Sequence, residues 1–544
     1  MGESKGTEGV DGIPLNQPLT WTCPEGHMFR FRRRPLLSSC MFIFCFLIME
    51  RAAVYCLRTF LFRRIEKAVA TSMQDATTGY VWISLYNGLY DLSPILLAVL
   101  SDTYLGNFKA IVVFGFTFVF GLVLVFLLNS SSLLASTAAP LWLNGIGLFI
   151  VTICAGGLLP LLTSFGARQF HPQSQTASGS RFFSLVYPMA SLGAIIGTII
   201  AVFVYTGTRK FAMVLLSAAI VGGLGWLGFI SGTKLYIERC MHSQTARRFF
   251  SLVFDCVRKL SVSKNCASNG GKYPNAFVGD FALVFRLVPV FVCLIPLYLG
   301  QLQFFTMLRA VASQLATPNF AFSRRMPAEM LQLTEPVTAI AVSFILNEFL
   351  YPLLRRRNLM PSHLTRLTTA ALLIVIGFVG CLLVTMAQRS RALTQADLGA
   401  EGIPSLSIFV LIGPLVLFAI GQLLITSSGL ELSWSYAPDG FKSISVALFS
   451  GIYAMGSLLS VGLFGALPRV SEAQTSIGDA TFARNRLYFV VCICLAAVSF
   501  ISLLCLRRFH AVTRERKIAR DVEKRALEIA KARLYSIVPA GDKV

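Results

Sequence analysis

Three charged residues, Glu50, Arg51 and Arg58, stand inside one apolar stretch, IMERAAVYCLRTFL. Glu50 and Arg51 are adjacent and point about 100° apart on a helix, so we expect each to need a partner on another helix or in a water-filled cavity. Arg51, Tyr55 and Arg58 follow i, i+4, i+7 spacing and share one face. Donors along such a stripe suit an anionic group such as a carboxylate. The structural alternative is that Glu50 and Arg51 only lock helices together.

One carboxylate, Glu431, stands at the end of a long apolar run, in the segment GLELSWSYAPDGFKS. A charge near a bilayer centre costs about 2.5 to 3.5 kcal/mol. Ser428, Glu431 and Ser435 repeat at spacings of three and four and form a polar stripe, and Pro438 then ends or kinks the helix. The carboxylate could pair with a substrate ammonium group or take up a proton. A purely structural Glu431 is the alternative.

A third pattern, AVLSDTYLGNFK, places Asp102, Gly106 and Lys109 at spacings of four and three. A short turn between two helices needs the glycine, and the flanking acid and base can pair with the neighbouring half at a cytoplasmic gate. The pattern resembles the loop signature of major facilitator transporters, with Ala98 where that signature usually has glycine.

The composition indicates the elements that must position these residues. The 544-residue chain is 55% hydrophobic and 14% charged, with a mean hydropathy of +0.68. This is more apolar surface than a soluble core needs, so we expect a polytopic membrane protein. The cysteines, serines and histidines form no recognisable nucleophile or metal constellation. We therefore expect neither an enzyme nor a prosthetic cofactor.

Twelve apolar runs are long enough, at about 20 residues each, to cross a bilayer as helices. The alternation of β-barrel strands is absent, so helices remain as the way to satisfy the backbone in lipid. The fold class we expect is an all-α membrane protein with twelve transmembrane helices. The runs are 36–62, 83–101, 110–129, 141–163, 182–205, 211–230, 281–308, 330–354, 366–387, 405–430, 442–467 and 486–506.

A polar stretch, Ser231 to Asp280, divides these runs six and six. Two six-helix halves joined by a long loop suggest the major facilitator architecture, in which the halves rock about a midplane site. The expected organisation is an N-terminal tail 1–35, a bundle 36–230, a linker 231–280, a bundle 281–506 and a basic tail 507–544.

Lysine and arginine favour the segments that lie inside if the N-terminus is cytoplasmic, which predicts that both ends are cytoplasmic. Arg63, Arg64 and Lys67 in the first outer loop oppose this bias. The net charge of +22 indicates topology and attraction to an anionic inner leaflet rather than nucleic-acid binding. The tail helix expected from His510 to Arg533 would rest on that leaflet or, alternatively, bind a protein partner.

Four segments between about Phe46 and Phe464 resemble the proton-coupled oligopeptide transporter (POT or PTR) family. They are MERAAVYCLRTFL, SPILLAVLSDTYLGNFK, AGGLLPLLTSFGARQF followed by RFFSLVYPMASLG, and GLELSWSYAPDGFKS. The resemblance implies uptake of di- and tripeptides, or of other small metabolites in divergent branches, driven by a proton gradient. The host membrane would be the plasma membrane or that of an acidic organelle.

The resemblance also implies roles for single residues. Arg58 would hold the substrate carboxylate, Tyr55 would line the pocket, and Glu431, with Ser435 on its stripe, would receive the amino end. Glu50 and Arg51 match the second acid and the arginine of the family's first-helix proton motif.

Departures from the family pattern fall on coupling positions. The first-helix motif opens with another acid where this chain has Leu47, and a fourth-helix lysine is replaced by Leu159. Losing one acid and one base leaves the net charge of the cavity unchanged. A seventh-helix acid beside Gln301 is replaced by Gly300, and the asparagine of the fifth-helix signature is Ser191.

The loss at position 300 has no evident compensation, so Glu50 and Glu431 would have to relay protons with fewer partners. Asp91 and Glu335 are candidate substitutes, and a place at a helix interface is the alternative for each. We expect a peptide transporter that works by alternating access. The alternative substrates are free amino acids such as histidine, nitrate or other small anions. A transport-impaired scaffold or nutrient sensor is the alternative from a different class.

Overall fold

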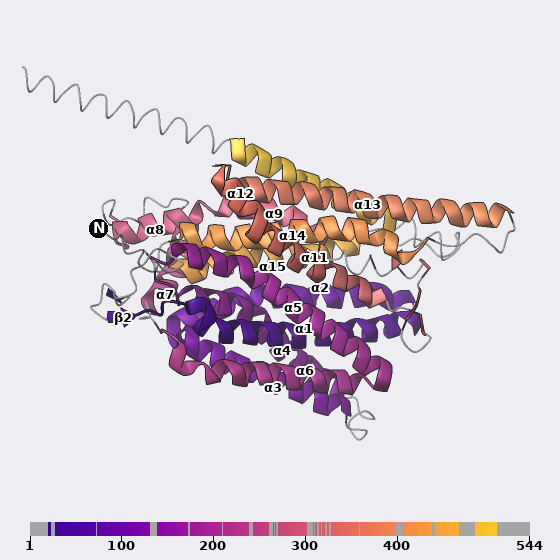
Figure 1. Cartoon of the computed structure of the whole chain (residues 1–544), viewed down its shortest axis with the longest axis horizontal. Coiled ribbons are helices and arrows are strands. Elements are labelled where there is room, and N and C mark those ends of the chain that lie inside the picture. The colour runs from indigo at the N-terminus through magenta and orange to yellow at the C-terminus, as the bar shows by residue number, and fades with distance from the viewer. Residues whose placement is uncertain are drawn as a thin grey trace, which may run out of the picture.

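The computed structural model is a bundle of long helices that lie side by side (Figure 1). Short strands pair outside the bundle as β1 (Thr20–Thr22) with β2 (Met28–Arg30) and as β3 (Asn319–Phe320) with β4 (Arg324–Arg325). The structure describes residues 20–22, 28–71, 73–130, 139–171, 174–208, 210–238, 243–259, 265, 267, 270–301, 308, 311–312, 315–316, 318–320, 324–325, 328–357, 359–398, 406–437, 441–466 and 485–508.

The N-terminal part of the bundle contains helices that pack mainly on one another, α1 against α5 and α6, and α4 against α2 and α3. In Figure 1 they form the indigo to magenta side of the molecule. Their bounds are α1 (Ser39–Thr71), α2 (Met73–Leu100), α3 (Asn107–Ser130), α4 (Ala139–Ala167), α5 (Thr176–Thr208) and α6 (Phe211–Ser231).

Two glycines on α5 set the position of α1. A Cβ atom on Gly193 would stand 2.3 Å from the backbone oxygen of Ile48, and one on Gly197 would stand 2.2 Å from that of Ala52. Small residues spaced four apart let helix backbones approach closely in a membrane. The contact therefore holds α5 against the turn of α1 that carries Glu50 and Arg51.

The C-terminal part is built from shorter and longer helices in the pink to yellow range of Figure 1. The run expected at 281–308 is divided between two helices, and the run expected at 330–354 contains a π-helical segment. The elements are α8 (Asn275–Phe285), α9 (Val288–Gln301), α11 (Thr334–Phe344), the π-helix η8 (Ile345–Leu350), α12 (Tyr351–Arg356), α13 (His363–Leu398), α14 (Ile412–Tyr436), α15 (Lys442–Ala466) and the helix Asn485–Arg508.

Ten helical segments among the described residues are long and apolar enough to cross a membrane. Two further long helices, α2 and α15, pack lengthwise against each other. Large apolar side chains on α3, such as Phe116 and Phe120, are more than half exposed, as expected for a face turned to lipid. The all-helical membrane bundle is thus confirmed, and the count of twelve spans stays a prediction.

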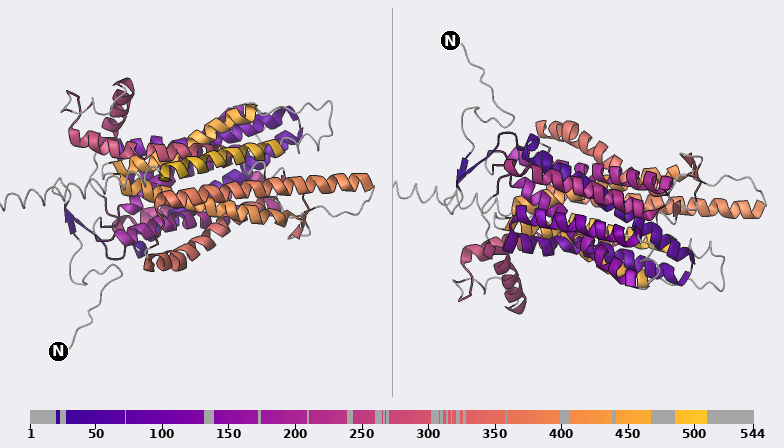
Figure 2. Two further views of the ribbon diagram at one scale, coloured as in Figure 1. Left: turned by 90° about the horizontal axis from the view of Figure 1, so that it is seen from above. Right: turned by 90° about the horizontal axis from the view of Figure 1, so that it is seen from below.

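The linker expected at 231–280 contains an amphipathic helix, α7 (Ser243–Lys259), which lies to one side at the end of the bundle (Figure 2). Its buried Phe249 contacts Phe281 of α8 at a ring distance of 5.3 Å and Phe441, before α15, at 5.6 Å. The helix also contacts the π-helix η2 (Ser101–Leu105) between α2 and α3. The linker therefore packs on both parts of the bundle at this end, which we call the linker end.

Candidate functional site

The two parts of the bundle meet where α2 packs on α15 and where α5 packs on α11 and α14. Most of the charged side chains singled out in the sequence lie on helices that form these contacts or on α1 beside them. They fall into two groups, an inner polar cluster around Arg58 and a cavity at the linker end that contains Glu431.

Glu50 and Arg51 contact each other as well as a neighbouring helix. Arg51 Nε lies 3.3 Å from Glu50 Oε2, and an Arg51 Nη1 hydrogen donates to the Tyr90 hydroxyl of α2. The expectation of a partner on another helix therefore holds for Arg51, which donates to Tyr90, whereas the partner of Glu50 is the adjacent Arg51. Glu50 is fully buried, and neither of its carboxylate oxygens accepts a hydrogen bond. Keeping such a group charged is costly.

Arg58 lies two turns further along α1 and is half-buried. Its Nη2 donates to Asn87 Oδ1 of α2 at 2.9 Å, and its guanidinium lies 5.9 Å from the ring centre of Tyr55. The structure thus brings together Arg58 and Tyr55, which the helical spacing placed on one face. Among the described residues no carboxylate is within ion-pair distance of Arg58. Its hydrogen-bonding capacity is therefore only partly used.

Two carboxylates are near enough to interact electrostatically with Arg58 without pairing with it. Glu335 on α11 accepts a 3.0 Å hydrogen bond from Tyr187 Oη of α5, and Asp91 on α2 accepts a 2.8 Å hydrogen bond from Ser457 Oγ of α15. Both bonds join the two parts of the bundle. The candidate substitutes Asp91 and Glu335 are therefore interface residues that also face the Arg58 cluster.

The C-terminal wall near this cluster carries neutral polar groups. Gln301 Nε2, at the end of α9, donates to Gln422 Oε1 of α14, and the Tyr453 hydroxyl lies 3.5 Å from Gln422 Nε2 and 3.2 Å from Thr426 Oγ1. The rings of Tyr298 and Tyr453 are 4.0 Å apart between centres. Sequence reasoning missed Gln422 and Tyr453, although a glutamine inside an apolar helix is itself a signal of a polar interior.

Gly300 does not face this interior. A Cβ atom at this position would lie 3.3 Å from Cys492 Sγ on the helix Asn485–Arg508, and the Gly300 carbonyl oxygen accepts a 2.6 Å hydrogen bond from Tyr488 Oη. The neighbouring residue Gln301 is the one that turns toward α14. An acid at position 300 would therefore have pointed between helices, away from the amide groups.

Glu431 lies in the last two turns of α14 and pairs within its own part of the bundle. Arg366 Nη1 of α13 donates to Glu431 Oε2 at 3.0 Å, and His363 Nδ1 lies 3.7 Å from the same oxygen. In the described part of the chain, Glu431 and Arg58 share no hydrogen bond or ion pair. Ser435, one turn further, is exposed. The structure thus does not bring the two expected charges of the site together, because Glu431 is near the helix end.

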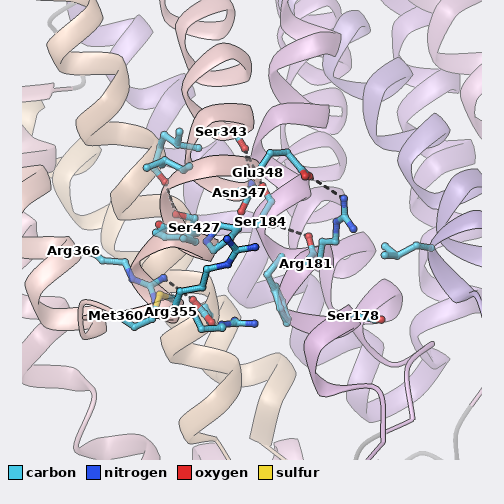
Figure 3. Close-up of a pocket in the computed structure, with 18 residues that line it drawn as sticks. Ser178, Arg181, Ser184, Ser343, Asn347, Glu348, Arg355, Met360, Arg366 and Ser427 are labelled. Atoms are coloured by element: carbon cyan, nitrogen blue, oxygen red, sulfur yellow. Dashed lines mark hydrogen bonds and ion pairs between the residues drawn. The ribbon is translucent and has the colours of Figure 1, made fainter. Parts of the chain in front are cut away.

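A cavity of about 650 Å³ opens beside Glu431 (Figure 3). Its walls come from α5, α11, η8, α12 and α14 together with the start of α13. Arg181 of α5 pairs across it with Glu348 of η8 at 3.0 Å. Arg355, Arg356 and Arg366 also line it, so four arginines face two glutamates.

The loop signature forms a turn at the same end of the bundle. Gly106 has a φ of +82°, a conformation that favours glycine, and its N–H donates to the Ser101 carbonyl at 2.8 Å. The Ser101 hydroxyl donates to Asn107 Oδ1 at 2.7 Å, and Lys109 is exposed. The side chain of Asp102 lies outside the described residues, as do those of Arg63, Arg64 and Lys67. No cluster of three metal-ligating side chains occurs in the part of the chain that was described.

Comparisons with known sequences agree on one family. The family model described as "POT family" matches residues 108–481. Solute carrier family 15 member 3 of Mus musculus is 23% identical over 359 residues, which cover 59% of this chain and 61%, less than two thirds, of that protein. Protein NRT1/PTR FAMILY 5.10 of Arabidopsis thaliana is 23% identical over 540 residues, which cover 87% of this chain and 93% of that one.

Solved structures show the same fold. The POT family transporter PepTSo superposes with a TM-score of 0.64 at 16% identity, over 86% of this chain and 98% of that one. An auto inhibited POT family peptide transporter gives a TM-score of 0.62 at 19% identity, over 86% and 96% of the two chains. This family and this fold are those of membrane transporters, not of enzymes. Because the family model matches well over half of the sequence, the chain belongs to the POT family.

Proposed function

We propose that the protein carries a small metabolite with an anionic group, in the first instance a di- or tripeptide, by alternating access coupled to protons. The observation that carries this proposal is the half-buried Arg58, whose partner is the amide of Asn87 and which has no carboxylate at ion-pair distance in the described residues. An interior cation held only by neutral groups favours binding of an anion. Arg58 and Tyr55 would bind the substrate carboxylate.

The proposed amino-end acceptor next to Arg58 is Glu335, in place of Glu431. Glu335 interacts electrostatically with Arg58 and comes from the other part of the bundle, so a peptide could bridge the two. Glu431 is already neutralised by Arg366, and Ser435 lies beyond it near the end of α14. We assign Glu431 to the cavity at the linker end, and Ser435 to the exposed end of the same helix.

Proton coupling is proposed to involve Glu50 with Arg51. A fully buried carboxylate without a hydrogen-bond donor changes its charge readily when its surroundings change, because the charged form is poorly solvated. The Tyr90 hydroxyl joins this pair to α2, which packs on α15 across the two parts of the bundle. Movement of the halves could therefore alter the environment of Glu50. Asp91 and Glu335 are the other proposed proton carriers.

The proposed topology has twelve spans, with α2 and α15 added to the ten apolar segments and both termini cytoplasmic. The linker end is then the cytoplasmic end. The boundaries 1–35, 36–230, 231–280, 281–506 and 507–544 remain our division of the chain. The scaffold or sensor alternative depends largely on the tail, and residues 509–544 lie outside the described part of the chain.

A second substrate class has its own support. Apart from the acidic Glu335, the C-terminal wall carries neutral groups, namely the amides of Gln301 and Gln422 and the hydroxyl of Tyr453. Such a wall suits a small anion without an ammonium group, such as nitrate, as well as a zwitterion. Uptake of dipeptides, of histidine and of nitrate, measured in parallel, distinguishes these substrates.

The test is uptake into proteoliposomes by the purified chain and its Arg58→Ala variant, with Arg286→Ala, an exposed arginine at the end of α8, as control. We expect Arg58→Ala to abolish uptake and Arg286→Ala to retain it, because only Arg58 faces the interior polar cluster. Uptake by Arg58→Ala at the parental rate would refute the site. Substrate-dependent acidification after a pH jump tests coupling separately, and its absence in an active protein would rule out symport.

A further inference from the structure

The cavity at the linker end contains more positive charge than its own carboxylates neutralise. Arg181 pairs with Glu348 and Arg366 pairs with Glu431, each at 3.0 Å. Arg355 and Arg356 of α12 line the same cavity and have no hydrogen-bond or ion-pair partner for their side chains among the described residues. Two unpaired guanidinium groups therefore face a space of about 650 Å³.

The arrangement of these arginines suits a ligand with several negative charges. In the view of Figure 3, the Arg355 side chain extends between Arg366 on one side and Arg181 on the other. Guanidinium groups bind phosphate oxygens in a bidentate manner, and several together recognise a polyvalent anion better than a single carboxylate. A volume of this size is ordinary for a small-molecule site. Ser184, Asn347 and Ser427 add neutral polar groups to the walls.

We propose that this cavity is a second binding site, separate from the Arg58 cluster, for a polyvalent phosphate ligand. Arg355 and Arg356 are its principal ligands, and Arg181 and Arg366 add positive charge around it. The chemistry would be met equally by a soluble inositol phosphate and by a phosphoinositide headgroup. The site was not anticipated from the residues that sequence reasoning selected, because Arg355 and Arg356 resemble ordinary positive flanks of a span.

Occupation of the site should oppose movement of the two halves. Arg181 belongs to α5 and the other three arginines belong to the C-terminal part, so a ligand that contacts both lies across the interface. Alternating access requires the halves to close at one end before they open at the other. A ligand that fills the cavity would keep the linker end open, and we expect it to slow turnover.

The test measures thermal stability of the purified full-length chain with inositol trisphosphate, at about 0.15 M salt to screen weak surface attraction. The variant is Arg355→Gln/Arg356→Gln, and the control is Arg357→Gln, the next residue, which is exposed and does not line the cavity. We expect the parent and the control to bind equally and the double variant to bind at least about tenfold more weakly. Equal stabilisation of all three proteins, or of none, would overturn the site.

A second arm identifies the source of the phosphate. Nanodiscs with and without phosphatidylinositol bisphosphate are compared with soluble inositol trisphosphate on the same three proteins. Stabilisation by the lipid or by soluble inositol trisphosphate supports the site if it depends on Arg355 and Arg356. The compound that binds more tightly identifies the source of the phosphate. If the lipid stabilises the double variant as much as the parent, the proposed site is contradicted. These experiments measure binding and not uptake, so their outcome does not depend on whether the Arg58 cluster transports a substrate.

Discussion

Arg58 and Glu431 have opposite charges and are both half-buried, yet their surroundings differ. Glu431 is paired at 3.0 Å with a cation from its own part of the bundle, and its side chain is 23% exposed. Arg58 has an amide partner from α2, and the carboxylates nearest to its charge, Asp91 and Glu335, are hydrogen-bonded to other groups. A charged side chain that is paired within one half keeps its partner when the halves move. A charged side chain without such a partner is available to a ligand. Transport chemistry is therefore expected at Arg58.

The largest effect that separates the two regions is expected from paired glutamate substitutions. Glu335→Gln should reduce dipeptide uptake by about tenfold or more, because the amide cannot pair with a substrate ammonium group. Glu431→Gln should change the Km of uptake by less than about threefold, because its carboxylate is held by Arg366. Both rates are measured in proteoliposomes at matched protein density. If Glu431→Gln were the more damaging variant, our assignment of the amino end would be reversed.

Removal of the Glu431 partner should affect stability more than transport. Arg366→Ala leaves a largely buried carboxylate beside His363 and should cost about 1 to 3 kcal/mol of unfolding free energy. The double variant Arg366→Ala/Glu431→Ala should recover part of this loss, since it leaves no unpaired charge. Thermal unfolding in detergent measures both. Additive losses in the double variant would mean that the two side chains do not act as a pair.

The exposed pair across the cavity should contribute little. Arg181 and Glu348 are 58% and 46% exposed, so Glu348→Gln should change stability by less than about 1 kcal/mol. Glu348→Gln is also the matched control for Glu335→Gln, because both acids belong to the α11–α12 region. Melting temperature and uptake are measured on the same preparations, and an uptake loss like that of Glu335→Gln would argue against a specific role for Glu335.

Ser435→Ala is expected to have the smallest effect. The side chain is exposed near the end of α14, so we expect parental uptake and stability within about 0.5 kcal/mol. Uptake and melting temperature check this expectation. A clear loss of substrate affinity would place the binding site closer to the linker end than we propose.

Helical spacing predicted correctly which residues of one helix lie on the same face. The spacing of Tyr55 and Arg58 placed them on one face, and the structure brings them within 5.9 Å of each other. The angular argument held for Arg51, which donates to Tyr90 of α2, but not for Glu50, because the two adjacent side chains are long enough to meet at 3.3 Å. For Gly300, only packing against Cys492 shows that position 300 faces away from the amides, which the sequence alone does not indicate.

Hydropathy, charge and motif spacing established a helical membrane transporter of the POT family, because long apolar runs in lipid leave the backbone no alternative to helices. The same information placed Arg58 and Glu431 in polar surroundings without showing which partners they have. The tertiary structure decided that, since helices far apart in sequence supply the partners: α2 supplies Asn87 for Arg58, and α13 supplies Arg366 for Glu431. It also revealed Arg355 and Arg356 beside a cavity, because a cavity exists only where both parts of the bundle contribute its walls.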